Sequence, residues 1–259
     1  MISYRKVTAV AAASILELFR RKDVYVALIL AAAIIFPLTT VALFGVEGVV
    51  RYLREIALML MWLFSIVLTI TTAARQFPGE IQRRTILPLL SKPVRRSEVV
   101  LGKFVGATSA SSLALVLFYV CYAILVGGRT GSWISWVLVQ AFILHVCFLA
   151  LVTALTLLGS MILTPSANIT CCTLVVVSML LFGQQLPEFA GNASTGVNGL
   201  VWVVHAVAPH FEFYDLRIRL VHEWGIMPLG IALGIVAYTV VYAAVLLSAT
   251  VYAFKRKRL

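Results

Sequence analysis

Few side chains in this sequence could do acid–base or metal chemistry, and they are scattered. His145 is the only titratable polar group deep inside a long apolar stretch, and His205, His210 and His222 follow in a later segment. Their spacings of five and twelve residues match no known zinc-ligand pattern, and a lone histidine among apolar helices most often hydrogen-bonds to a neighbouring helix. We therefore expect no catalytic residue and no metal site in this chain.

The sequence also lacks the motifs of nucleotide and hydrolase chemistry. It contains no Gly-x-x-x-x-Gly-Lys-Ser/Thr phosphate loop, no Gly-x-Ser-x-Gly elbow and no His-Glu-x-x-His pair. The four cysteines, Cys121, Cys147, Cys171 and Cys172, lie in apolar runs without zinc spacing and are interpreted as core residues. We expect a protein that is not an enzyme, holds no cofactor and draws any energy it uses from a partner.

The composition predicts an all-α, polytopic integral membrane protein that forms a single transmembrane domain over residues 1–259. Of its residues 62% are apolar and 12% charged, with a mean hydropathy of +1.02, whereas a soluble domain carries roughly a quarter charged residues. A transmembrane helix needs about 20 apolar residues. Six stretches qualify, and none contains Asp, Glu, Lys or Arg: 24–46, 56–74, 107–126, 136–164, 167–186 and 226–254.

The distribution of basic residues predicts the orientation of these six spans. Most of the 21 Lys and Arg fall in three stretches, 5–22, 75–103 and 255–258, which alternate with the spans so that they share one side of the membrane. By the positive-inside rule that side is cytoplasmic, and it holds both termini. The net charge of +11 therefore reflects topology, and no nucleic-acid partner is expected.

Two segments outside the spans carry further predictions. Residues 1–23 have an apolar helical face and basic residues elsewhere, which is typical of an amphipathic helix lying on the inner membrane surface. In the external loop 187–225, residues 197–208 are apolar but too short to span, which indicates a re-entrant or interfacial segment. We expect an external lid here that includes Trp202, His205, Pro209 and Phe211.

The most informative segment is residues 75–106, which we call the basic hairpin. Pro78 and Glu80 suit the first turn of a helix, Pro93 forbids its simple continuation, and Ser97 could cap a new helix that enters the third span. We expect a short helix parallel to the membrane, tied to two spans and able to pass force from a soluble partner to the bundle.

The basic hairpin resembles the cytoplasmic signature of permease subunits of ATP-binding-cassette (ABC) transporters of the type-2 exporter class. That signature runs from an acid through Arg-Thr, Leu-Leu, Ser, Pro and a basic residue to Gly-Lys. The matching residues are Glu80, Arg84, Thr85, Leu89, Leu90, Ser91, Pro93, Arg95, Arg96, Gly102 and Lys103, while Gln82 and Pro88 depart from the pattern. The Arg-Thr-Ile version is most similar to the branch labelled as permeases for multicopper-enzyme maturation, and residues 208–216 are also similar to that branch.

The resemblance implies a membrane-spanning permease subunit of an ABC transporter in a prokaryotic cell (inner) membrane. Two permease subunits, identical or homologous, would pair, and two separate ATPase subunits would dock below them and bind the ATP. Glu80, Arg83, Arg84 and Thr85 would make the docking contacts. An apolar bundle without charges favours a hydrophobic or amphiphilic substrate that is exported or extracted from the inner leaflet.

Two other interpretations of the sequence stay open. The chain could be a non-transporting membrane anchor of an ATPase-driven envelope or signalling complex, because coupling to an ATPase looks the same in both cases. It could also be a six-span lipid-modifying enzyme, although the sequence offers no convergent set of catalytic groups at one depth.

Overall fold

The structure is a computed structural model that describes residues 8–13, 16, 29, 47–82, 95–130, 135–186, 188, 199, 201–203, 205–206, 208–222 and 224–256. These residues form helices and connecting turns, and no strand occurs among them. The all-α fold class is therefore confirmed for the described part of the chain.

Five helices in the described residues are long and apolar enough to cross a membrane. They are α3 (Glu47–Gln82), α5 (Arg96–Thr130), α6 (Trp136–Ile162), α7 (Pro165–Phe182) and α11 (Leu229–Arg256). Each contains one of the stretches expected to span, from the second to the sixth, apart from a few residues at their ends. The first expected span, residues 24–46, lies outside the described residues except for Ile29.

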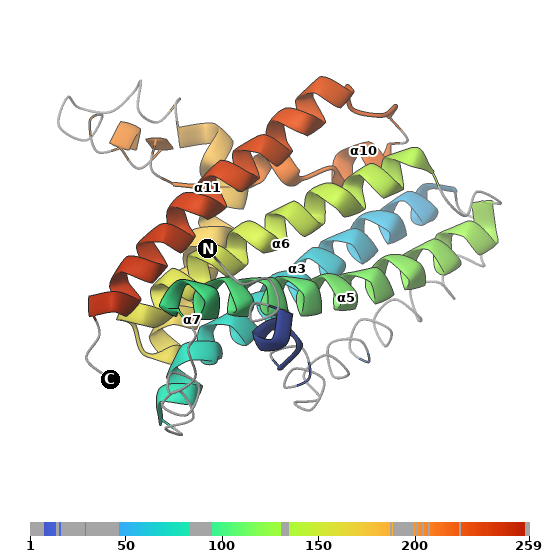
Figure 1. The fold of residues 1–259 in the computed structure, drawn as a ribbon. Helices are drawn as coiled ribbons and strands as arrows, with labels where there is room; N and C mark the ends of the chain where they lie inside the picture. The colour runs from blue at the N-terminus through green and yellow to red at the C-terminus, as the bar shows by residue number, and fades with distance from the viewer. Residues whose placement is uncertain are drawn as a thin grey trace.

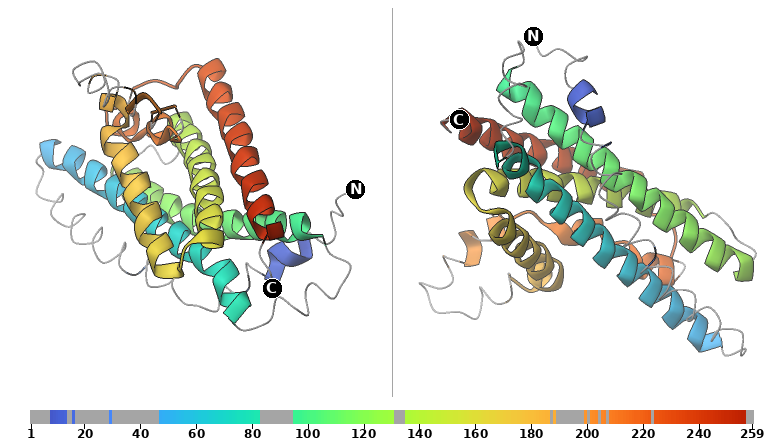
Figure 2. Two further views of the ribbon diagram at one scale, coloured as in Figure 1. Left: turned by 90° about the vertical axis from the view of Figure 1, so that its left-hand side faces the viewer. Right: turned by 90° about the horizontal axis from the view of Figure 1, so that it is seen from below.

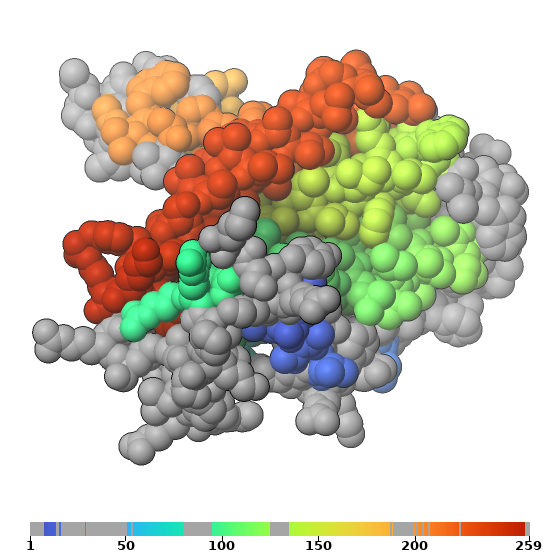
Figure 3. All heavy atoms as spheres, viewed as in Figure 1, coloured from blue at the N-terminus to red at the C-terminus, as the bar shows by residue number. Residues whose placement is uncertain are grey.

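Helix α6 is the centre of the bundle, because it packs against α3, α5, α7 and α11 (Figure 1). Figure 2 (left) shows α7 and α11 on opposite sides of α6. Only 17% of the most apolar part of α11 is buried, against 61% in α6. Helix α11 therefore lies on the surface of the described bundle, as the space-filling view in Figure 3 shows.

Successive long helices alternate in direction, which gives the bundle two distinct ends. At one end α3 stops, α5 starts and α11 stops (Figure 1). We call it the basic end, because it carries the described residues of the basic hairpin together with Lys255 and Arg256. At the opposite end lie the start of α6 and three short elements, η2 (Gly183–Gln185), η3 (Phe211–Tyr214) and α10 (Arg217–Val221).

The basic hairpin differs from its expected form at both of its described ends. Pro78 lies inside α3, so the expectation that it opens a separate helix was wrong. The helix continues because its last turns are packed: Ala74 and Phe77 are fully buried, and Lys103 Nζ donates to the Gln76 carbonyl oxygen at 3.3 Å. Pro78 leaves the Ala74 carbonyl oxygen without its helical partner, and close packing by neighbouring helices around this turn makes the proline tolerable in a membrane helix.

The start of α5 is capped by a residue other than the expected one. The carbonyl oxygen of Arg95 accepts the first helical hydrogen bonds, from the N–H groups of Glu98 and Val99. The Glu98 carboxylate in turn accepts the Arg95 N–H at 2.9 Å, which is half of a capping box. Arg95 is therefore the cap, and Ser97 lies within the first turn of α5.

Only part of the expected amphipathic segment 1–23 is described. Residues 8–13 are helical, Ala11 is buried and Leu16 is exposed. A helix is therefore confirmed for residues 8–13, and its position at the membrane interface stays a prediction.

Candidate functional site

At the basic end, Arg96 ties the start of α5 to the end of α11. Its Nη1 donates to the carbonyl oxygens of Phe254 at 2.6 Å and Lys255 at 3.0 Å, and the guanidinium lies 5.3 Å from the centre of the Phe254 ring. The last four carbonyl groups of a helix have no partner within it and carry the negative end of the helix dipole. The Arg96 guanidinium of α5 therefore donates to carbonyl groups at the end of α11 that have no partner within the helix.

A second contact adds α3 to this junction. The rings of Phe77 on α3 and Phe254 on α11 lie 5.5 Å apart, and both residues are fully buried. The ammonium of Lys103 on α5 lies 5.0 Å from the centre of the Phe77 ring. We call Phe77, Arg96, Lys103 and Phe254 the end clamp, because these four residues fasten three helices where the basic hairpin enters the bundle.

The residues predicted to couple the chain to a partner fall into three groups. Arg95 is exposed and Arg96 half-buried, whereas Gly102 and Lys103 are buried inside the end clamp region. Glu80 lies in the last turn of α3. The others lie outside the described residues: Arg83, Arg84, Thr85, Leu89, Leu90 and Pro93. Lys103 is buried and donates to α3, so the contacts that the structure shows for it lie within the bundle.

At the opposite end, residues 208–222 enter the bundle, and we call this segment the wedge. Phe211, Tyr214, Leu216 and Val221 are buried. The Phe211 ring packs edge-on against Phe148 at 5.4 Å. Phe148 lies twelve residues into α6, which corresponds to about 18 Å along the helix. The wedge therefore contacts α6 well inside the bundle, about 18 Å along the helix from its first residue.

Hydrogen bonds attach the wedge to α11. The Thr239 hydroxyl donates to the Ile235 carbonyl oxygen at 2.8 Å, so its single proton is used. Tyr214 must then donate in the 2.7 Å bond between the two hydroxyl groups. One residue away, the Tyr238 hydroxyl accepts the His210 N–H at 3.1 Å. Because of these hydrogen bonds, a movement of α11 would displace the wedge directly.

The wedge also brings charges against the bundle that the spans themselves lack. Arg217 pairs with Asp215 through hydrogen bonds of 2.6 to 3.1 Å and lies 5.2 Å from the centre of the Trp62 ring on α3. The Glu212 carboxylate lies so close to Gly183 that a Cβ there would collide with it. The sequence places these three charges in the external loop, but it carries no signal that they contact the bundle.

Behind the wedge, His145 joins three helices. Ser65 on α3 donates to the Trp62 carbonyl oxygen at 2.8 Å, so its oxygen accepts the proton of His145 Nε2 at 2.9 Å. The other ring nitrogen, Nδ1, then faces the Tyr119 hydroxyl of α5 at 3.5 Å as an acceptor. The Trp62 ring stacks on the imidazole at 4.3 Å. The expected hydrogen bond between His145 and a neighbouring helix is thus confirmed.

The expected lid residues lie in two different places. Pro209 and Phe211 are buried in the wedge, whereas Trp202 is exposed and packs against His205 at 5.9 Å. The buried side chains of this region belong to the wedge, which begins at residue 208. The sequence predicts the re-entrant or interfacial segment earlier, at residues 197–208. His205 and His210 have ring centres 4.5 Å apart, and no cluster of three metal-binding side chains occurs among the described residues.

These features define a polytopic helical membrane protein with a clamped basic end and a wedge at the other. In sequence comparisons, the family profile described as ABC-2 family transporter protein matches residues 3–259. The chain therefore belongs to this family and is a membrane-spanning permease of the ABC transporter type, which implies an ABC ATPase partner. The comparison with curated proteins found no match. The finer similarity to the multicopper-enzyme maturation branch stays a prediction.

From the end clamp we expect that Arg96, and not its neighbour Arg95, stabilises the fold at the start of α5. Arg96→Ala removes both bonds to the α11 carbonyl groups and should destabilise the end of α11 by about 1–2 kcal/mol, the cost of losing charge-assisted hydrogen bonds. Faster amide hydrogen exchange in residues 250–256 would report it. Arg95→Ala, which removes an exposed side chain, is the matched control, and equal exchange in both variants would contradict the clamp.

The burial pattern of the wedge can be tested with two cysteines placed two residues apart. Phe211 is fully buried and Phe213 is 47% exposed. A membrane-impermeant maleimide should therefore label Phe211→Cys at least roughly tenfold more slowly than Phe213→Cys, because it must wait for local opening. Labelling of the unsubstituted chain gives the background. Similar rates for the two variants would show that the wedge is not inserted.

Proposed function

We propose that this permease is driven by a separate ABC ATPase that docks on the basic hairpin at the cytoplasmic face. The observation that carries this proposal is the end clamp, in which the start of α5 is bonded to the end of α11 by Arg96 and stacked on it through Phe254. A protein that binds the basic hairpin would contact the segment between α3 and α5. Through the end clamp it would also be connected to α11. The exposed Arg95 and the basic residues of the hairpin offer the polar surface expected of a docking site that must also release.

In the proposed mechanism, ATP binding moves the ATPase, and the basic hairpin moves with it. The end clamp passes this displacement to α11, whose other contacts include the wedge at Tyr238 and Thr239. The wedge would then shift at the opposite face and act as a lid that contains two of the four expected lid residues, Pro209 and Phe211. At that end Gln140 restrains the start of α11. Its side-chain amide accepts the Met227 N–H and donates to the Met227 carbonyl oxygen, just before α11 begins.

Charge supports this orientation and the remaining architecture. The basic end carries the residues that the positive-inside rule places in the cytoplasm, so both termini would be cytoplasmic and residues 24–46 would supply a sixth span in a prokaryotic inner membrane. We further propose that two permease subunits and two ATPase subunits form the working complex.

The substrate is proposed to be hydrophobic or amphiphilic and to be exported or taken from the inner leaflet. The described helices bury few ionisable groups, and at the wedge Arg217 is paired with Asp215, while Glu212 Oε2 is buried with no hydrogen-bond partner among the described residues. Ion pathways, in contrast, are usually marked by charged groups inside the spans.

The docking proposal is tested by reversing charge in the hairpin. Arg83→Glu with Arg84→Glu should lower the amount of P-loop ATPase that co-purifies with the tagged chain from native membranes, because like charges across an interface cost several kcal/mol. Mass spectrometry of the eluate measures the ATPase. Arg51→Glu, an exposed change at the opposite end, should leave co-purification unchanged, and so would the hairpin variant if the proposal is wrong.

A further inference from the structure

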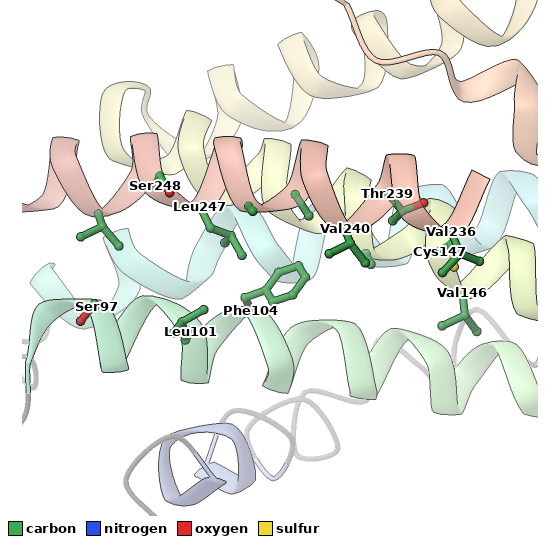
Figure 4. A pocket seen from close by; sticks show the side chains of 14 residues that line it. Ser97, Leu101, Phe104, Val146, Cys147, Val236, Thr239, Val240, Leu247 and Ser248 are labelled. Carbon is green, nitrogen blue, oxygen red and sulfur yellow. The ribbon is translucent and has the colours of Figure 1, made fainter. Parts of the chain in front are cut away.

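A long apolar groove runs along the bundle between α5 and α11, with α6 as its floor. It has a volume of about 690 Å³ and is open to the side. Figure 4 shows Leu101 and Phe104 of α5 facing α11 across it. Along α11 the lining runs from Val236 to Val251, which corresponds to about 22 Å of helix. The groove is therefore longer than the roughly 15 Å of hydrocarbon in one leaflet.

The groove lies where α11 packs along α6 and only sparsely against α5, while polar contacts fix α11 near both of its ends. Arg96 fastens one end and Gln140 fixes the residue before the other. Between them, small side chains such as Ala150 on α6 and Ala243 and Ala244 on α11 leave space beside α5. Because of this geometry, a flexible hydrocarbon chain can enter from the bilayer without displacing any helix.

Positive charge marks the basic end of the same groove. Lys255 follows the lining residue Val251 by four positions and so continues the same face of α11. Arg95 stands just before α5, two positions before the lining residue Ser97, and both cations are exposed. The nearby acid Glu98 is 1% exposed and accepts the Arg95 N–H, so its charge is turned inward.

We propose that this groove is a binding site for an anionic phospholipid, with an acyl chain between α5 and α11 and the phosphate at Lys255 and Arg95. Apolar lining along the length of one leaflet and cations at the membrane surface match the two halves of such a lipid. A helix of a second chain, about 10 Å wide with its side chains, is the alternative occupant that the crosslinking experiment distinguishes. Arg95 also belongs to the proposed docking surface, but the lipid site needs no ATPase, so it is tested on the permease chain alone.

Photo-crosslinking of the full chain in vesicles tests this assignment. The probes are phosphatidylglycerol and phosphatidylcholine that carry the same diazirine-labelled acyl chain, and mass spectrometry maps the labelled peptides. Phosphatidylglycerol should label peptides containing Phe104 or Leu247 several-fold more than phosphatidylcholine does. Ala244→Trp, which fills the groove from its open side, should abolish this labelling, whereas Ala249→Trp, exposed on the same helix and outside the groove, should not.

A charge variant tests whether the groove prefers an anionic headgroup, separately from whether an acyl chain can enter the groove. Lys255→Gln should lower the preference for phosphatidylglycerol about fivefold, the effect of one basic residue near a membrane surface. Arg75→Gln removes an exposed charge at the same end on α3 and should leave the preference intact. Equal labelling by both lipids, labelling that survives Ala244→Trp, or crosslinks between two copies of the chain through the groove would each overturn the proposal.

Discussion

The arrangement of this permease depends on one interaction, the binding of the α11 carbonyl groups by Arg96. Lipid tails are as apolar as leucine, so hydrophobic burial does not drive helices together inside a membrane. An exposed helix such as α11 is therefore positioned by polar contacts and close packing. Because the cation comes from the start of α5, the last span is held by the same segment that forms one arm of the basic hairpin.

From this junction a continuous set of contacts leads to the other face. Helix α11 carries Tyr238 and Thr239, which bond the wedge, and the wedge places Arg217 beside Trp62 on α3. His145 then connects α3 and α5 to α6 behind it. The structure thus links both ends of the bundle through few polar residues, which gives a path from the basic end to the wedge.

The sequence was sufficient to predict what depends on hydropathy and charge. The five described spans, the helical class and the family followed from apolar length and from the ordered residues of the hairpin. It could not predict that Pro78 continues a helix, because Phe77 and Lys103 supply that support from tertiary packing. Nor could it show that Lys103 is buried or that Asp215 and Arg217 lie against the bundle, since both depend on how distant segments meet.

The central claim is that a partner ATPase grips the basic hairpin and that its movement reaches the wedge. Amide hydrogen exchange of the chain in complex with its ABC ATPase tests this most directly. The account predicts slower exchange in residues 75–106 when the ATPase binds, and a further change in residues 208–222 when ATP is added. Unchanged exchange in residues 75–106, with protection confined to other segments, would contradict it.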